Sequence, residues 1–295
     1  MNSVLTLVAN PEDLPSLSST LSTAEARLQE LGATDITRTW LKDGFAVDLA
    51  FTAELNSIDI AADLEAVDWC LQPVTNRKKK LLLADMDSTI ITVECIDELA
   101  DFAGLKEQVS EITEKAMRGE LEFDDAFKSR VAMLTGLKEE VLDKTFDERV
   151  KLTAGARTLI QTLKKDGCYS ALVSGGFTYF TGRVRDLVGF DMDDANELLF
   201  ENGALTGKAA EPILNSSAKL ANLNRLLEEK GLDRSQSVAI GDGANDIPMI
   251  EAAGLGVAFH AKPKAQDAAD ASIRYGDLTT LLYYQGYKSI EFVED

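Results

Sequence analysis

Two short apolar runs in this chain each end in closely spaced aspartates, and this repeated pattern constrains the fold most. The runs cover 81–84 and 238–241. The acidic residues that follow them are Asp85, Asp87, Asp242 and Asp246. If both runs are neighbouring parallel strands, their carboxyl ends meet at one sheet edge, where open α/β sheets bind ligands. Carboxylates crowded there require a cation, and hard oxygen ligands favour Mg²⁺, which usually accompanies phosphate.

The charge and residue usage of the chain exclude several classes of function. Its 295 residues carry a formal net charge of −20, which argues against nucleic-acid partners and against acidic membrane surfaces. We find no signal peptide and no apolar window of about 18 residues, so we expect a cytoplasmic protein without a membrane span. Three cysteines without C-x-x-C spacing and a single histidine argue against disulfide frameworks, thiolate metal sites and multi-histidine zinc sites.

The patterning predicts a small N-terminal domain, a basic linker and a larger domain. Residues 1–75 follow the order β-α-β-β-α-β, with the second helix at 58–67, which is typical of a small α+β domain of ferredoxin-like type. We interpret 76–80 as a solvated linker whose lysines protect the next strand, with a phosphate-binding patch as the alternative. Residues 81–295 alternate strands and helices, which predicts the α/β class with a doubly wound parallel sheet.

Helical segments interrupt this alternation directly after the first strand of the larger domain. We expect four of them, at 95–103, 106–118, 122–134 and 138–149. Helices inserted at this point predict a cap of about residues 95–150 over the sheet edge. Farther on, we expect a strand at 169–173 that ends at a Ser-Gly-Gly turn, and a hairpin at 197–206 with Asn202-Gly203 as its turn.

The first aspartate pair suits phosphoryl chemistry. Positions i and i+2 of an extended segment face the same side, so Asp85 and Asp87 can converge on one reacting atom. One carboxylate can attack phosphorus and form an aspartyl-phosphate. The other can protonate the leaving alkoxide and then take a proton from water. An acidic turn without catalytic function is the alternative.

Three further segments supply candidate ligand-binding groups. In the G-D-G-A-N-D motif, Asp242 and Asp246 are four residues apart, so a helical turn brings them to one side, and Asn245 offers an amide. Ser174 and Gly175 lie between a strand and a helix, where a hydroxyl and backbone N–H groups can hold phosphate. Lys219 could bring positive charge to a phosphoryl group. A surface turn, an ordinary βα turn and a surface lysine are the respective alternatives.

In chain order, the motifs D-x-D-S-T, S-G-G, lysine and G-D-G-x-N-D resemble those of the haloacid-dehalogenase superfamily of phosphatases, and more closely the phosphoserine phosphatase family. The closer resemblance depends on 85–89, on Glu94 just behind them and on 123–130 in the predicted cap. It covers about residues 79–295. The N-terminal domain resembles the ACT-like extension of bacterial members.

The resemblance implies a role for each matching aspartate. Asp85 matches the nucleophile and also supplies a metal oxygen. Asp87 matches the general acid/base, and its backbone carbonyl matches a metal ligand. Asp242 matches the third protein ligand of Mg²⁺, with Asp246 in support.

The resemblance also implies the substrate contacts. Glu94 matches the partner of a substrate ammonium, and Arg130 matches the partner of its carboxylate, which the guanidinium fork suits. Further phosphate and substrate contacts are implied for Ser174, Gly175, Lys219 and Asn245. Met117 and Phe123 match apolar cap positions over the substrate, with packing between cap helices as the alternative.

We therefore predict a Mg²⁺-dependent phosphatase that converts O-phospho-L-serine and water to L-serine and phosphate. One alternative is a phosphatase or phosphotransferase of the same superfamily that acts on another small phosphomonoester. An alternative of a different class is an amino-acid-sensing regulatory protein, suggested by the small N-terminal domain. The sequence leaves the oligomeric state open, with a homodimer as one alternative.

Overall fold

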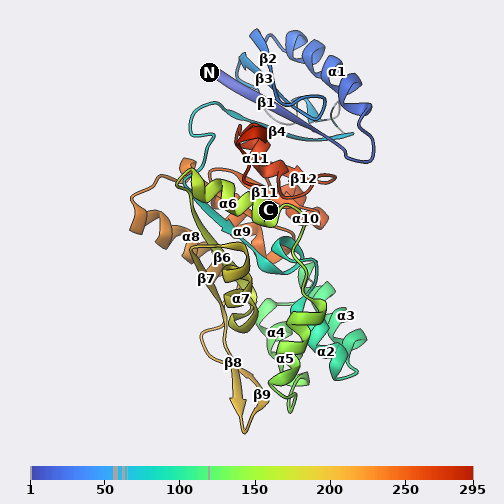
Figure 1. The fold of residues 1–295 in the computed structure, drawn as a ribbon, viewed down its shortest axis with the longest axis vertical. Helices are drawn as coiled ribbons and strands as arrows, with labels where there is room; N and C mark the ends of the chain where they lie inside the picture. Colours follow the sequence, from blue (N-terminus) through green and yellow to red (C-terminus); the bar gives the residue numbers. More distant parts are fainter. Residues whose placement is uncertain (1, 56–58, 62–63, 65, 119, 295) are drawn as a thin grey trace.

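The computed structural model describes residues 2–294 apart from 56–58, 62–63, 65 and 119. An N-terminal unit, a central sheet with its helices, and a group of cap helices follow one another along the long axis (Figure 1). The N-terminal unit contains β1 (Asn2–Ala9), α1 (Ser16–Glu30), β2 (Thr34–Lys42), β3 (Ala46–Thr52) and β4 (Val67–Pro73).

The N-terminal unit is an antiparallel sheet in the order β2-β3-β1-β4, with its own apolar core. Leu17, Leu21 and Leu28 recur at helical spacing on α1 and pack against the sheet, which fixes the buried face of this helix. These strands and the first helix confirm the expected order. Of the second helix expected at 58–67, residues 58, 62–63 and 65 lie outside those described, and Val67 already belongs to β4. The ACT-like character of the unit stays a prediction.

The central sheet confirms the predicted parallel, doubly wound arrangement. Its strand order is β12-β11-β10-β5-β6-β7, and every neighbouring pair is parallel. These strands are β5 (Leu81–Ala84), β6 (Tyr169–Phe177), β7 (Met192–Asn196), β10 (Ser237–Gly241), β11 (Gly256–Phe259) and β12 (Ala271–Ile273). The helices of this region are α6 (Ala156–Lys165), α7 (Thr178–Val188), α8 (Ser216–Lys230), α9 (Ile247–Ala252), α10 (Pro263–Ala268) and α11 (Thr280–Tyr284). Short 3₁₀ turns lie at Arg234–Gln236, Ala244–Asp246 and Ser289–Glu291.

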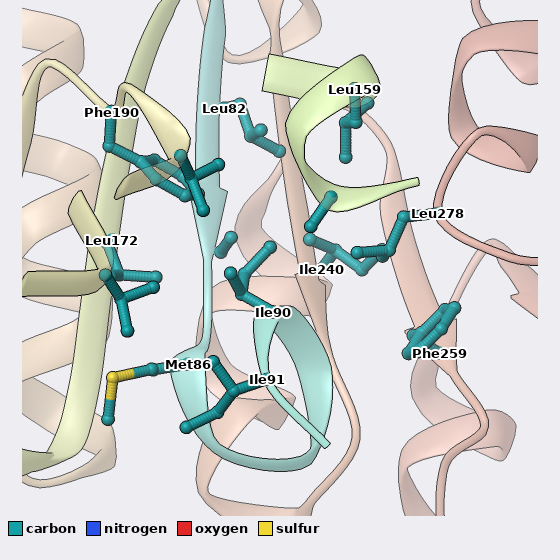
Figure 2. Packing of buried hydrophobic residues seen from close by; sticks show 14 of the residues in the cluster. Leu82, Met86, Ile90, Ile91, Leu159, Leu172, Phe190, Ile240, Phe259 and Leu278 are labelled. Carbon is teal, nitrogen blue, oxygen red and sulfur yellow. The ribbon is translucent and has the colours of Figure 1, made fainter. Parts of the chain in front are cut away.

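Alternate residues of the central strands enter two separate cores because successive side chains point to opposite faces. Leu82 and Ile240 pack with Leu159 of α6 on one face (Figure 2). Leu83 and Ala239 pack on the other face, with side chains of α8 and α9. Helices on both faces explain why these strands are apolar throughout rather than alternating.

The N-terminal sheet continues into the central sheet. Strand β4 pairs antiparallel with β12 at Trp69 and Ser272, which gives one ten-stranded sheet. Arg77 lies at this junction, where it pairs with Asp48 at 2.6 Å, and Lys79 is buried.

The interpretation of 76–80 as a solvated linker is therefore wrong for Arg77 and Lys79. Arg77 Nε donates to the carbonyl of Tyr284 at 2.9 Å, and Lys79 Nζ donates to the carbonyl of Ser235 at 2.9 Å. Both cations are covered because the N-terminal sheet packs against the central region at this point. The domain limits placed at 75 and 80 stay a prediction.

The four helices expected after β5 are confirmed, each to within two residues, and we call them the cap. They are α2 (Cys95–Phe102), α3 (Lys106–Met117), α4 (Phe123–Met133) and α5 (Glu140–Arg149). The predicted hairpin is also present as β8 (Leu198–Glu201) and β9 (Ala204–Ala209), with positive φ at Asn202 and Gly203, as a type I′ turn requires. The backbone of Leu205 in this hairpin bonds to Gly136 and Leu137, in the segment between α4 and α5. No helix in the described part of the chain is long and apolar enough to cross a membrane.

Candidate active site

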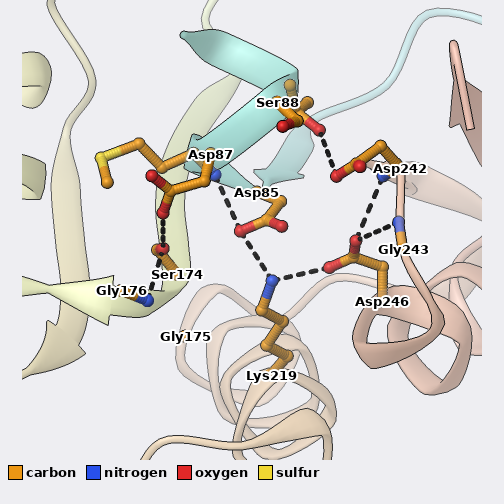
Figure 3. Close-up of polar contacts among 12 residues, drawn as sticks. Asp85, Asp87, Ser88, Ser174, Gly175, Gly176, Lys219, Asp242, Gly243 and Asp246 are labelled. Carbon is orange, nitrogen blue, oxygen red and sulfur yellow. Dashed lines mark hydrogen bonds and ion pairs between the residues drawn. The ribbon is translucent and has the colours of Figure 1, made fainter. Parts of the chain in front are cut away.

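Strands β5 and β10 are direct neighbours, so the two aspartate motifs begin at the same edge of the sheet. Ala84 pairs with Ile240, and the N–H of Asp85 donates to the carbonyl of Ile240 at 3.0 Å. The structure brings together the four carboxylates expected there, all of them buried: Asp85, Asp87, Asp242 and Asp246 (Figure 3). The expected convergence of the two motifs is therefore confirmed.

A tight turn after β5 directs the first pair of aspartates into the site. Asp85 has extended backbone, and its Oδ1 accepts from the N–H of Met86 at 2.8 Å. Ser88 adopts a positive φ of 54°, and its hydroxyl donates to Glu94 Oε1 at 2.5 Å. Met86 and Ile90 of this turn are buried in the apolar core (Figure 2), so packing holds the turn in place.

Asp87 faces the end of β6 and the start of α2. Its Oδ2 accepts from the hydroxyl of Ser174 at 3.2 Å, and its Oδ1 accepts from the N–H of Cys95 at 2.9 Å. Burial raises the pKa of Asp87, against these hydrogen bonds, which lower it. A carboxyl group with a raised pKa is suited to carry a proton near neutral pH.

Lys219 reaches the same carboxylates from α8. Its Nζ lies 2.7 Å from Asp85 Oδ1 and 2.6 Å from Asp246 Oδ1, and the side chain is fully buried. Burial lowers the pKa of Lys219, but the carboxylates of Asp246 and Asp85 more than offset this and raise the pKa overall. The lysine is therefore a charged group of the site rather than the surface lysine that was the alternative.

Both carboxylate oxygens of Asp246 already have partners within the protein. Its Oδ1 pairs with Lys219, and its Oδ2 accepts from the N–H groups of Asp242 and Gly243 at 3.2 and 3.1 Å. Gly241 leaves room for this side chain, because a Cβ there would lie 2.3 Å from Asp246 Cγ. Asp246 thus anchors the loop that presents Asp242.

The acidic cluster fits a divalent cation by its donor chemistry. One carboxylate oxygen from each of Asp85, Asp242 and Asp246 lies within 4.8 Å of the others. Burial, with Asp246 as the next cause, raises the pKa of Asp85 to about 7. Burial, with Glu94 as the next cause, also raises the pKa of Asp242. Lys219 alone does not compensate these charges, and hard carboxylate oxygens are the ligands that Mg²⁺ prefers.

The Ser-Gly-Gly segment differs from the expected turn because β6 continues through it to Phe177. The register with β7 shifts between Val173 and Phe177, so the segment is irregular strand. The N–H of Gly176 donates to Ser174 Oγ at 2.9 Å. A Cβ on Gly176 would lie 2.7 Å from Asp87 Oδ2, so only glycine fits there without displacing the acid.

The cap closes the site from the side opposite the sheet edge. A cavity of about 60 Å³ is lined by nearly all the predicted site residues, namely Asp85, Asp87, Glu94, Arg130, Ser174, Gly175, Asp242 and Asn245. Lys219 and Asp246 are not among its lining residues, although Lys219 contacts Asp85, which is. The side chains of Met117 and Phe123 lie outside what the structure describes, so their predicted position over the substrate stays untested.

Glu94 and Arg130 bring a carboxyl group and a cation to the cavity. Burial, with Asp87 as the next cause, raises the pKa of Glu94 to about 8. Arg130 is only 6% exposed, and burial lowers its pKa. The two side chains come from the segments before α2 and within α4, so their approach depends on how the cap helices pack.

Three contacts of the site lie beyond the residues that the sequence singled out. Thr89 Oγ1 donates to Asp242 Oδ1 at 3.4 Å. The N–H of Cys95 donates to Asp87, and the hydroxyl of Thr113 accepts from Arg130. Thr89 was part of the D-x-D-S-T motif, so its place in the motif was the available signal. Thr113 carried no signal, because nothing in the periodicity of α3 distinguishes it from other threonines.

Comparison with known proteins gives matches that include the part of the chain that forms this site. The haloacid dehalogenase-like hydrolase family matches residues 82–251, which span both aspartate motifs. A phosphoserine phosphatase of Haemophilus influenzae is 48% identical over 224 residues, covering 76% of this chain and 70% of that protein. A phosphoserine phosphatase of Archaeoglobus fulgidus is 43% identical over 246 residues, covering 80% of this chain and 71% of that protein.

Solved structures agree with these matches. A family hydrolase from Salmonella enterica has a TM-score of 0.82 at 28% identity and covers 97% of this chain and 98% of its own. A substrate-bound phosphoserine phosphatase complex has a TM-score of 0.68 at 40% identity and covers 70% of this chain and 98% of its own. The match to the Salmonella hydrolase covers nearly all of this chain and so includes the N-terminal unit. The match to the phosphoserine phosphatase complex covers a smaller part of the chain. The chain belongs to the haloacid dehalogenase-like hydrolase family.

Proposed function

We propose that this protein is a phosphatase that converts O-phospho-L-serine and water to L-serine and phosphate. The observation that carries the proposal is that Asp85, Glu94 and Arg130 line the same cavity. Phosphoserine has a phosphate, an ammonium and a carboxylate, and these residues offer one group for each. The phosphoserine phosphatases among the relatives support the same substrate.

In the proposed first step, an oxygen of Asp85 attacks phosphorus, and the bond from phosphorus to the serine oxygen breaks. Asp87 gives its proton to the departing serine oxygen, for which its raised pKa equips it. The serine leaves as an alcohol, and the phosphoryl group stays on Asp85. Lys219 and the N–H of Met86 both contact Asp85 Oδ1 and hold the carboxylate in one orientation.

In the proposed second step, Asp87 is an anion and takes a proton from water. The water oxygen attacks phosphorus, the bond to Asp85 breaks, and phosphate leaves. The hydroxyl of Ser174 and backbone N–H groups near Gly175 are the donors that we assign to the phosphoryl oxygens. Lys219, which contacts Asp85, would add positive charge to the phosphoryl group held there. The cap covers the site on the solvent side, which limits access of bulk water.

Asp85, Asp242 and the backbone carbonyl of Asp87 are the groups that we propose for Mg²⁺, with Asp246 in support. The bound cation would neutralise the carboxylates and stabilise the charge of the phosphoryl oxygens. The fit of the donor set, described above for the side chains, supports this choice of metal.

Phosphate release from a panel of phosphomonoesters, with Mg²⁺ or with excess chelator, tests the proposal. We expect phosphoserine to give the highest kcat/KM and to require Mg²⁺, ahead of phosphoethanolamine and 3-phosphoglycerate, which each lack one recognition group. Serine and phosphate should form in equal amounts. An excess of serine over phosphate would indicate transfer to another alcohol, and equal rates on all substrates would contradict phosphoserine specificity.

A further inference from the structure

A chain of hydrogen bonds across the cap holds the guanidinium of Arg130. Nη1 of Arg130 donates to Thr113 Oγ1 at 2.9 Å, and Thr113 Oγ1 donates to Asp97 Oδ1 at 2.8 Å. Arg130 belongs to α4, Thr113 to α3 and Asp97 to α2. The hydroxyl of Thr113 thus joins a buried cation on one helix to a carboxylate on another.

Two of the three guanidinium nitrogens of Arg130 are held by the protein, and the third is not. Nε of Arg130 donates to the carbonyl of Ala126 at 3.2 Å. Among the described residues, Nη2 has no hydrogen-bond partner. Every fully buried side-chain nitrogen in that part of the chain does have a partner. Nη2 is therefore not fully buried, and Arg130 lines the cavity, so this nitrogen is the one left free to meet a ligand there.

The other end of the chain is also fixed. Asp97 Oδ2 accepts from the hydroxyl of Ser110 at 2.7 Å, so both carboxylate oxygens have partners on α3. Thr113 is 3% exposed, and its hydroxyl also lies 3.1 Å from the carbonyl of Val109 one turn earlier. A long arginine side chain loses much rotational freedom when it is held in one geometry, and bonds made before binding reduce that cost.

We propose that Thr113, supported by Asp97, is a positioning residue that aims the Arg130 guanidinium at the carboxylate of the substrate. The inference rests on the proposed function, because it assumes that the ligand carries a carboxylate. It assigns Thr113 no contact with the reacting atoms. It predicts that losing its hydroxyl weakens recognition of the carboxylate and spares the chemical step.

The test is Thr113→Val, which keeps the shape of the side chain and removes the hydroxyl. We expect kcat/KM for phosphoserine to fall about 10-fold or more, mainly through KM, because the hydrogen bond involves a charged partner. The value for phosphoethanolamine, which has no carboxylate, should stay within about threefold. Thr113→Ser should restore phosphoserine turnover, and Asp97→Asn should lower it in the same substrate-selective way.

Thr145→Val is the matched control. Thr145 is a buried threonine of cap helix α5 whose hydroxyl donates to the carbonyl of Val141 one turn earlier, and it has no bond to an arginine. We expect Thr145→Val to leave the ratio of the two substrates unchanged. If Thr113→Val lowers both substrates equally, or neither, Thr113 does not position Arg130.

The proposed function and this inference fail in different ways. If the wild-type enzyme shows no preference for phosphoserine over phosphoethanolamine, the assumed ligand is wrong. If the wild type prefers phosphoserine and Arg130→Ala removes that preference while Thr113→Val and Asp97→Asn do not, only the positioning role is wrong. Thermal unfolding of each variant shows whether a loss arises from a destabilised cap.

Discussion

The ammonium of Lys219 lies 2.7 Å from Oδ1 of Asp85, and both side chains are buried. The same ammonium contacts Asp246 at 2.6 Å, so one cation serves two carboxylates below the sheet edge. Sequence order alone had suggested a role for this lysine in holding phosphate. Its position indicates an additional role, which is to keep two acidic side chains in place before any ligand binds.

Replacing Lys219 with methionine should therefore cost stability as well as activity. Two buried carboxylates would lose their counter-charge, at a cost of about 3–5 kcal/mol in the free energy of unfolding. Urea unfolding without Mg²⁺ measures this loss. Lys165→Met, at an exposed site on α6, is the control and should change stability by less than about 0.5 kcal/mol. Equal unfolding midpoints for both variants would contradict the pairing role.

Asp242 should have opposite effects on stability with and without the metal. Burial raises its pKa above the ordinary value, so at neutral pH the ionised form destabilises the folded state. Without Mg²⁺, Asp242→Asn should therefore be at least as stable as the wild type. With Mg²⁺, the wild type should be the more stable, because the ion binds the folded site. Thermal unfolding with and without chelator shows which of the two proteins is the more stable in each condition. A wild-type unfolding temperature that does not change with Mg²⁺ would exclude the proposed metal site.

Arg130→Ala should separate substrates by their carboxylate. A substrate carboxylate left without its partner in a buried site costs roughly 2–5 kcal/mol of transition-state stabilisation. We expect that loss in kcat/KM with phosphoserine and almost none with phosphoethanolamine. Arg118→Ala, at an exposed position of the cap, is the control and should affect neither substrate. Equal losses on both substrates would mean that Arg130 only stabilises the cap.

Glu94 should give the enzyme a pH-dependent preference for amines. Its pKa is raised to about 8 by burial and by Asp87, so the free enzyme holds it mainly neutral below that pH and ionised above it. Only the ionised form attracts an ammonium. The ratio of kcat/KM for phosphoserine to that for 3-phosphoglycerate should therefore rise between about pH 7 and pH 9. Glu94→Gln should abolish the rise, and a flat ratio in the wild type would remove Glu94 from ammonium recognition.

The convergence of Asp85 and Asp242 could be predicted from sequence because it depends on local pattern and a general rule. An apolar run followed by aspartate marks a strand end, and parallel strands align their carboxyl ends. The four cap helices were predictable for a similar reason, since each is a local helix-like segment and no strand pattern interrupts them. Roles for Glu94 and Arg130 came only from the resemblance, because nothing local distinguishes them from surface charges.

Other features depend on tertiary partners that a single sequence does not reveal. Arg77 and Lys79 read as solvated linker residues, yet Asp48 and backbone carbonyls distant in sequence cover them. Strand β7 was missed because its residues Met-Asp-Asp-Ala-Asn are mostly polar, as an edge strand tolerates. Thr113 acts through the packing of α2, α3 and α4, and no motif encodes that packing.

The covalent step at Asp85 is the central claim, and rapid acid quench of the wild-type enzyme turning over phosphoserine tests it most directly. Mass spectrometry of the peptide that contains Asp85 should show one added phosphoryl group, located on Asp85 and absent from Asp85→Asn. That variant should stay folded and lose activity by more than about 10³-fold, because its amide cannot attack phosphorus. Steady turnover with no phosphoryl group on Asp85, or with the group on another residue, would contradict the account.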